Sequence, residues 1–215
     1  MNKEKKYRDL IFQIIKLYRK ARKVKFNNQK ISRGRSHSVS SIVEDLFAKF
    51  LVENIKCDKI FIDQPISIDG LSNTSYPDLL ITKGNIIIGT CDLKMDMGWN
   101  RDGIYDLCNK SFDLVKKIRS KNCKIRSGTD KSIINFKISG KCFHNIIIIS
   151  GENNNKVKLE KQRKESLKFS PLVNVFVLTS GKHLNTYNIK DRKLLDMINI
   201  DINEFNRLLE TFTLL

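Results

Sequence analysis

Two hydrophobic periods alternate along this chain, one typical of helices and one typical of strands. Apolar residues recur every three or four positions from about Tyr7 to Lys23 and again from about Ser41, as on the buried stripe of an amphipathic helix. Further helical stretches run from Asp102 to about Ser120 and from about Val157 to Lys168, and two short ones end the chain. The apolar runs between them are short and bounded by turn residues, which predicts strands. This order predicts an α/β fold, with a central mixed sheet flanked by helices.

The most continuous apolar pattern predicts a β-hairpin that ends in charged residues. Asp78 to Ile81 and Ile86 to Lys94 flank Lys83-Gly84-Asn85, a turn signal. Strands this apolar are covered on both faces, so charges beside them are costly unless they have a use. The charges are Pro77-Asp78 at the start of the hairpin and Asp92-Leu93-Lys94 at its end.

The turn decides whether the two aspartates face each other. If Lys83-Gly84-Asn85 is a three-residue loop, Asp78 pairs opposite Thr90 and lies one diagonal step from Asp92 on the same face. A different turn length would move Asp78 to the other face. The shared face is therefore a prediction that depends on the register of the hairpin.

Two neighbouring carboxylates repel each other, and a divalent cation relieves the repulsion. A site made of Asp78, Asp92, the backbone carbonyl of Leu93 and waters is hard and oxygen-ligated, which favours Mg²⁺, with Mn²⁺ able to substitute. Lys94 shares the face of Asp92, where its amine can hold a water in line with a phosphorus and donate to developing negative charge. The alternative is that Lys94 only neutralises the two acids.

Charge is distributed unevenly along the chain. The net charge is +17, from 40 basic and 23 acidic residues. Lys3 to Arg35 holds 13 basic and 2 acidic residues, a net +11, and Lys110 to Lys141 holds 10 and 2, a net +8. Between them, Glu44 to Asp106 holds 11 acidic and 6 basic residues, a net −5. A negative segment between positive ones favours a metal site flanked by phosphate-binding surfaces, and hence a nucleic acid partner, over an acidic protein or a membrane surface.

Other features restrict the class of protein. The five cysteines are widely spaced without a CxxC pair, which argues against a zinc site and a disulfide framework. The longest aliphatic run, Ile146 to Ile149, is far shorter than the roughly 20 residues that span a bilayer. The basic N-terminus lacks the apolar stretch of a secretory signal. We therefore expect a cytoplasmic protein without membrane association, forming one domain over residues 1–215.

Pro77-Asp78, thirteen intervening residues and then Asp92-Leu93-Lys94 resemble the motif of the PD-(D/E)xK nuclease superfamily. The acid-x-Lys pattern also occurs at Glu4/Lys6 and Asp191/Lys193, but only Asp92 follows an apolar strand with Pro-Asp at hairpin distance. The resemblance covers about residues 38–150. It implies a restriction-endonuclease-like core there, preceded by a basic helix and loop (1–37) and followed by a strand and helices (151–215).

Within that superfamily, the chain is most similar to small type II restriction endonucleases. The resemblance implies a Mg²⁺-dependent homodimer in which each subunit cuts one strand of double-stranded DNA at a short specific sequence. It also implies a glutamate from the preceding helix in the metal shell, directly or through water. Glu44 is the candidate, ahead of Asp45 and Glu53. The alternative is that Ser41-Ile42-Val43-Glu44 is a capping box, which would hold Glu44 at the helix N-terminus.

Candidate DNA contacts lie in three segments of the chain. Arginines bind guanine edges or phosphates in two-pronged fashion, and a solvated loop that touches only phosphates is the alternative. The candidates are Arg33, Arg35 and His37 before the second helix, Arg101 after the hairpin, and Lys116 and Lys117 at the end of the third helix.

Two other functions share these features. A structure-selective nuclease such as a junction resolvase would use the same acids and lysine but read DNA shape. A non-catalytic nucleic-acid-binding module would keep the acids for structure alone. A complete set of two acids and a lysine disfavours the second.

Overall fold

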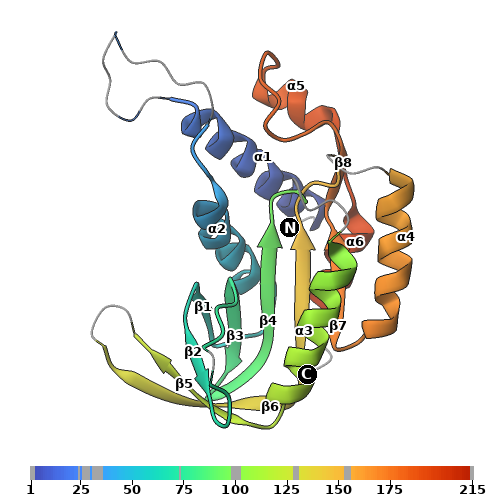
Figure 1. The fold of residues 1–215 in the computed structure, drawn as a ribbon. Coiled ribbons are helices and arrows are strands. Elements are labelled where there is room, and N and C mark those ends of the chain that lie inside the picture. The colour runs from blue at the N-terminus through green and yellow to red at the C-terminus, as the bar shows by residue number, and fades with distance from the viewer. Residues whose placement is uncertain are drawn as a thin grey trace.

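The computed structural model describes residues 3–23, 25, 30, 36–72, 74–97, 103–127, 131–152 and 156–213. One mixed sheet runs through the molecule, and helices cover both of its faces (Figure 1). The predicted α/β class and the central mixed sheet are confirmed.

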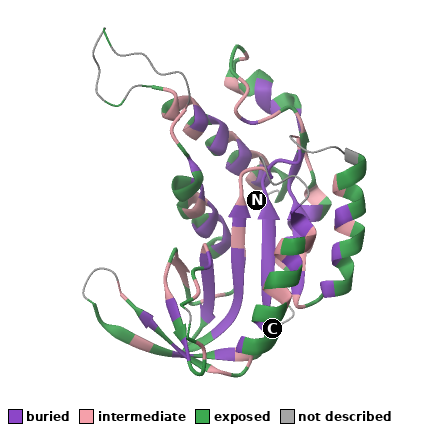
Figure 2. Ribbon diagram, viewed as in Figure 1, coloured by how far each residue is buried: buried purple, intermediate pink, exposed green. Residues whose placement is uncertain are grey.

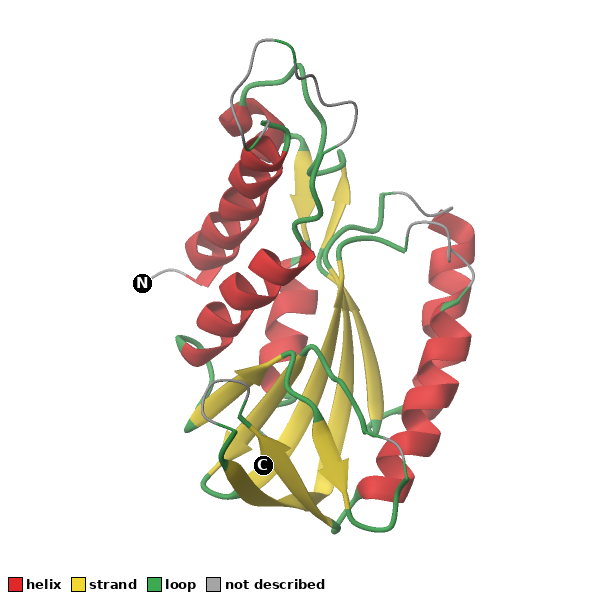
Figure 3. Ribbon diagram, turned by 60° about the vertical axis from the view of Figure 1, so that its left-hand side comes forward, coloured by secondary structure: helices red, strands yellow, loops and turns green. Residues whose placement is uncertain are grey.

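Each face of the sheet is covered by different helices, as the two orientations in Figures 1 and 3 show. On one face lie α1 (Lys3–Ala21), α2 (Ser40–Val52) and α6 (Ile202–Glu210), whose apolar stripes pack on the alternate residues of the central strands. On the other face lie α3 (Ile104–Ile118) and α4 (Lys156–Ser166), which continues into the 3₁₀ turn η1 (Leu167–Phe169). The short α5 (Asp191–Asp196) lies against α1.

The large sheet has the order β1-β3-β4-β6-β5-β2, and β7 also pairs with β6. Strands β4, β6 and β7 are parallel to one another, and the other pairs are antiparallel. The strands are β1 (Lys59–Ile62), β2 (Ile66–Ile68), β3 (Leu79–Lys83), β4 (Ile86–Lys94), β5 (Asn122–Arg126), β6 (Ile133–Ile148) and β7 (Val173–Val177). A separate small sheet pairs β8 (Thr179–Gly181) with β9 (Ile198–Ile200).

The lower half of the large sheet in Figure 1 curls on itself. One long strand, β6, pairs with β5 through its first half and with β7 through its second half. The inside of the curl is a separate apolar cluster that includes Leu80, Ile87, Ile125 and Phe136. The upper half of β4 and β6 is flat and buried between helices (Figure 2). The carboxyl end of β4 therefore lies at the flat end of the sheet, away from the curl (Figure 1).

Several elements differ from the sequence prediction. The apolar stretches 133–138 and 143–150 predict two separate strands, but the structure joins them in the one strand β6. Strand β5 was not expected, because its sequence NCKIR lies in a basic cluster that resembles a solvated helix end; its Cys123 and Ile125 are nevertheless buried. Ile42 continues the apolar spacing of α2, which predicts a buried side chain, but this prediction is wrong, since Ile42 is 51% exposed.

Among the described helices, none combines the length and the apolar character that crossing a membrane requires.

Candidate functional site

The register of the β3–β4 hairpin brings Asp78 to the side of Asp92. Lys83 pairs with Ile86, so the loop has two residues, Gly84 and Asn85, and not three. A two-residue loop alone would put the two aspartates on opposite faces, because thirteen residues separate them. A β-bulge corrects this.

The bulge lies in β4 at Ile88. Thr82 pairs with Ile87 and Ile81 pairs with Gly89, so Ile88 is one extra residue on its strand. Leu79 then pairs with Cys91, and the next position in that register sets Asp78 opposite Asp92. The expectation that Asp78 lies opposite Thr90 is thus wrong, since Leu80 has that place. The expectation that both aspartates share a face is confirmed, with the bulge as its cause.

Gly89 secures the irregular segment. A Cβ on this residue would come 2.7 Å from Cζ of Phe143 on the neighbouring strand, closer than side-chain carbons approach in proteins. The ring of Phe143 is buried and also contacts Phe212 of the C-terminal segment, with 5.2 Å between ring centroids. Glycine therefore allows β4 and β6 to approach at the bulge.

Lys94 lies between the two carboxylates. Its Nζ is 3.9 Å from Oδ2 of Asp78 and 3.8 Å from Oδ2 of Asp92. All three side chains are between one quarter and one third exposed, so the cluster opens to solvent while its base is buried. The structure thus brings together the three residues of the sequence motif.

Asp78 also replaces a missing strand partner. Its Oδ2 accepts a hydrogen bond of 2.6 Å from the backbone N–H of Leu93, where β4 extends past Leu79, the first residue of β3. The N–H and C=O of one residue in a strand point to the same side. The carbonyl of Leu93 therefore points to the side where β3 is absent, which is where a ligand of the carboxylates would bind.

The electrostatics of the cluster favour a cation. The pKa of Asp78 is raised, mainly by burial and further by the neighbouring carboxylates of Asp92 and Asp63. The hydrogen bond from Leu93 and the ammonium of Lys94 lower the pKa, but they do not offset the rise. A carboxylate whose ionised form is destabilised by burial and by a second carboxylate is stabilised when a cation binds.

Glu44 is coupled to this cluster from α2. Its pKa is raised by partial burial and by Asp78, Asp63 and Asp45, and is lowered by Lys94. The capping-box alternative is wrong: α2 begins at Ser40, its N-cap is Val39, and no side chain makes a cap hydrogen bond. Glu44 is therefore available to the cluster. The less favoured Glu53 instead pairs with Lys49, at 3.8 Å.

The donor set fits Mg²⁺ through two carboxylates only. In the described part of the chain, no group of three or more His, Cys, Asp or Glu side chains is arranged to hold a metal ion. Mg²⁺ is commonly held by one or two carboxylates while it keeps several waters. Asp78 and Asp92 with the Leu93 carbonyl match that mode of binding, and Glu44 would act through water.

Sequence reasoning missed three residues around the cluster. Asp63 is the acid that follows β1, and its N–H donates to the carbonyl of Asp78 over 2.9 Å. His144 and Thr90 pair across β6 and β4, with 2.8 Å between Nδ1 and Oγ1, and Nε2 of His144 is 4.0 Å from Oδ2 of Asp92. In the sequence, no other residue stands at metal-ligand spacing from His144, which favours a structural role for it. Only the parallel pairing of β4 with β6 could reveal its place.

The candidate DNA contacts within the described residues lie on other segments than the two carboxylates. Arg33, Arg35 and Arg101 lie outside the described residues. His37 is half-buried, and its backbone N–H donates to the carbonyl of Ala21 at the end of α1, over 2.8 Å. Lys116 and Lys117 are exposed in the last turn of α3, which lies at the opposite end of the sheet from Lys94 (Figure 1).

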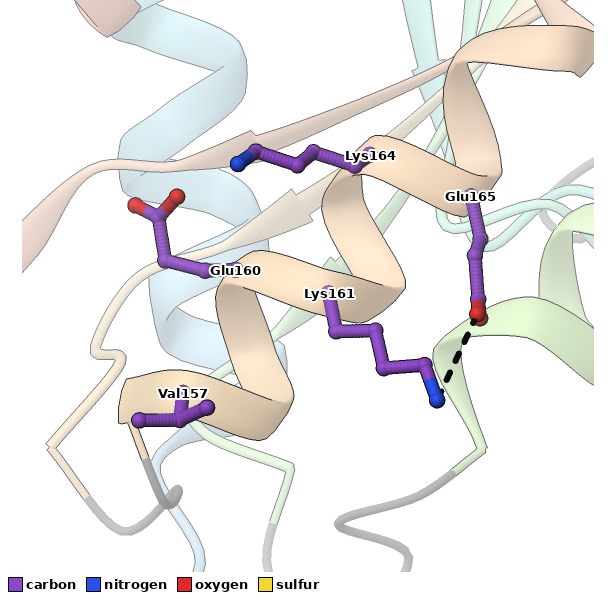
Figure 4. Close-up of a pocket in the computed structure, with 5 residues that line it drawn as sticks. All are labelled: Val157, Glu160, Lys161, Lys164 and Glu165. Atoms are coloured by element: carbon purple, nitrogen blue, oxygen red, sulfur yellow. Dashed lines mark ion pairs between the residues drawn. The ribbon is translucent and has the colours of Figure 1, made fainter.

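The hollow along α4 does not resemble a chemical site. Figure 4 shows its side chains, which come from one helix and include an exposed Lys161–Glu165 ion pair of 3.9 Å. Its lining residues are Val157, Glu160, Lys161, Lys164 and Glu165. Alternating charges on an exposed helix are typical of a solvated face.

Comparisons of the chain with protein-family models, with curated proteins and with solved structures gave no match.

Proposed function

We propose that this protein is a Mg²⁺-dependent endonuclease that hydrolyses phosphodiester bonds of double-stranded DNA at a short specific sequence, as type II restriction enzymes do. One observation carries the proposal: Nζ of Lys94 lies within 4 Å of the carboxylates of both Asp78 and Asp92. The setting also supports it, since the cluster ends a hairpin of a mixed sheet with helices on both faces, the core that the resemblance implies.

Each residue of the cluster has a role in this chemistry. Asp78, Asp92 and the Leu93 carbonyl would hold the ion, and Glu44 would bind one of its waters. The ion, when bound, polarises the phosphodiester and lowers the pKa of an attacking water. The Lys94 ammonium orients that water and donates to the charge that develops on the phosphate.

The strong positive charge supports a polyanionic substrate. A net charge of +17 raises the local concentration of DNA and speeds encounter, independently of sequence. A duplex substrate with two strands to cut favours a homodimer, in which each protomer supplies one cluster.

The test is incubation of plasmid DNA with the purified protein and Mg²⁺, followed by sequencing of the ends. Discrete fragments with uniform ends are expected. Asp92→Ala and Lys94→Ala should abolish cutting while DNA binding persists, and sedimentation should give a dimer. Cleavage confined to branched DNA would assign a structure-selective nuclease instead. The absence of cleavage with both Mg²⁺ and Mn²⁺ would overturn the nuclease proposal.

A further inference from the structure

His144 is a buried imidazole with one nitrogen left over. It lies on β6 directly beside Thr90 of β4, and 9% of its side chain is exposed. Its Nδ1 is hydrogen-bonded to the Thr90 hydroxyl over 2.8 Å. Its Nε2 is buried and has no hydrogen-bond partner among the described residues. A buried polar atom without a partner costs about 1–3 kcal/mol, so its presence requires an explanation.

The unpaired nitrogen is directed to the candidate site. Nε2 lies 4.0 Å from Oδ2 of Asp92, too far for a hydrogen bond but close enough to form one after a small rotation of the carboxylate. Because β4 and β6 are buried between helices, the ring itself has little room to move. The side chain of Asp92 is 28% exposed, which leaves its carboxylate room to rotate toward Nε2.

Thr90 determines which nitrogen carries the proton. Among the described residues, the hydroxyl of Thr90 has Nδ1 as its hydrogen-bond partner and no other. If Nδ1 donated, the hydroxyl proton would be left without an acceptor and the Nε2 lone pair would face the negative Asp92. If the hydroxyl donates to Nδ1, Nε2 carries the proton and faces the carboxylate as a donor. The second arrangement satisfies both groups.

We propose that His144 is a positioning residue that holds Asp92 in its metal-binding orientation, through an Nε2–H···Oδ2 hydrogen bond that closes when the ion binds. The inference rests on the proposed function, because it needs Asp92 to be a metal ligand. Hydrogen bonds to ligating carboxylates fix their orientation, and their loss typically lowers metal affinity about 10- to 100-fold.

Two substitutions separate this role from simple packing. His144→Gln carries an amide N–H near the position of Nε2 and can still donate to Asp92. His144→Asn carries a polar group near the position of Nδ1 and keeps only the partner of Thr90. Mn²⁺ affinity is measured by EPR titration of the purified protein without DNA. The Asn variant should bind Mn²⁺ about 10- to 100-fold more weakly than wild type, and the Gln variant within about 3-fold.

A spectroscopic measurement on the unmodified protein completes the test. Long-range ¹H–¹⁵N NMR of the imidazole should show the Nε2–H tautomer, and added Mg²⁺ should shift the Nε2 resonance. An Nδ1–H tautomer would overturn the inference even if both variants failed to fold.

The outcomes distinguish the inference from the function beneath it. Asp92→Asn should lose Mn²⁺ binding; if it binds as wild type does, the metal site itself is wrong. If Asp92→Asn loses binding but His144→Asn does not, the role of His144 is wrong and the proposed function stands. If the Gln and Asn variants lose affinity equally, His144 acts through packing, and the inference is again overturned.

Discussion

Two aspartates four residues apart in the sequence each lie near a histidine. The two pairs differ in how many of their polar atoms are hydrogen-bonded. Asp96, four residues beyond Asp92, has Oδ2 at 3.0 Å from Nε2 of His183, and Nδ1 of His183 accepts the N–H of Asn185 over 3.0 Å. Both ring nitrogens of His183 are used. Asp92 and His144 are separated by 4.0 Å, and Nε2 of His144 has no partner among the described residues.

Glu204 shows the satisfied state in a more buried position. Its carboxylate is 10% exposed and is 2.9 Å from Arg163 and 2.9 Å from Arg207, while the N–H of Val177 donates to it over 3.3 Å. Asp96 and Glu204 are thus compensated at hydrogen-bond distance, whereas Asp78 and Asp92 share the one ammonium of Lys94 at 3.8–3.9 Å. Incomplete compensation is typical of functional sites, where stability is given up for chemistry.

The largest expected effect is a loss of cleavage activity on substitution of Lys94, the residue shared by Asp78 and Asp92. Lys94→Met should lower the cleavage rate by about 10²- to 10³-fold, since it removes a charged donor from the reacting phosphate. Stability should change little, because the ion pairs of Lys94 are long and its side chain is 34% exposed. Single-turnover cleavage measures the rate, and urea unfolding measures the stability. Lys83→Met, at the turn of the same hairpin, is the matched control and should cut at the wild-type rate. If both variants cut slowly, the loss comes from the lower net positive charge and not from the position of Lys94.

Glu204→Ala should lower the stability of the protein more than its cleavage rate, the reverse of Lys94→Met. The change leaves two arginines and the N–H of Val177 without their acceptor, and we expect a loss of about 2–3 kcal/mol, less than for a fully buried pair because both arginines are partly exposed. Urea unfolding measures the loss. Glu165→Ala, in the exposed pair with Lys161, should cost under about 0.5 kcal/mol. An equal loss in both variants would show that the ion pairs of Glu204 stabilise the fold no more than the exposed pair of Glu165.

Asp78→Asn should stabilise the metal-free protein at pH 7 and raise its Tm. The pKa of Asp78 is raised in the folded state, so its ionised form costs stability at neutral pH. That cost fades as pH falls through the folded pKa and is absent below the unfolded value near 4. Calorimetry of the variant and the wild type should show the stability gain at pH 7 and no gain below about pH 4. A variant less stable at pH 7 would show that Asp78 is structural.

His183→Gln should have the smallest effect. We expect a loss of under about 1 kcal/mol from the partly exposed pair with Asp96, with Mn²⁺ affinity and cleavage unchanged. Thermal unfolding and EPR titration measure these. A fall in Mn²⁺ affinity like that of His144→Asn would mean that both histidines act only through the local fold.

Long periodic segments could be predicted from the sequence, and short or paired ones could not. The buried stripe of α1, from Leu10 to Tyr18, follows directly from its spacing. The capping interaction of α6 could also be predicted, and Asp201 accepts the N–H of Glu204 over 3.0 Å. Strands β8 and β9 have three residues each, too few for a period to appear.

The candidate site was predicted in part for the same reason. Asp78, Asp92 and Lys94 share one hairpin, so local spacing predicts that they lie together, but it does so from a three-residue loop, whereas the structure has a two-residue loop and a bulge at Ile88. His144 reaches them only through the pairing of β4 with β6, which links residues 54 positions apart. Ile88 is as apolar as its neighbours, and nothing in its identity distinguishes a bulged residue from a paired one.

The bulge at Ile88 has a consequence for how such sites vary among sequences. Whether two hairpin residues share a face depends on whether the number of residues between them is odd or even, and a bulge reverses that parity at the cost of one residue. Deleting Ile88 would leave an even spacing with the same two carboxylates side by side, across an unbroken ladder. The same site can therefore be built at either parity, and a motif search that fixes the spacing would find one parity and miss the other.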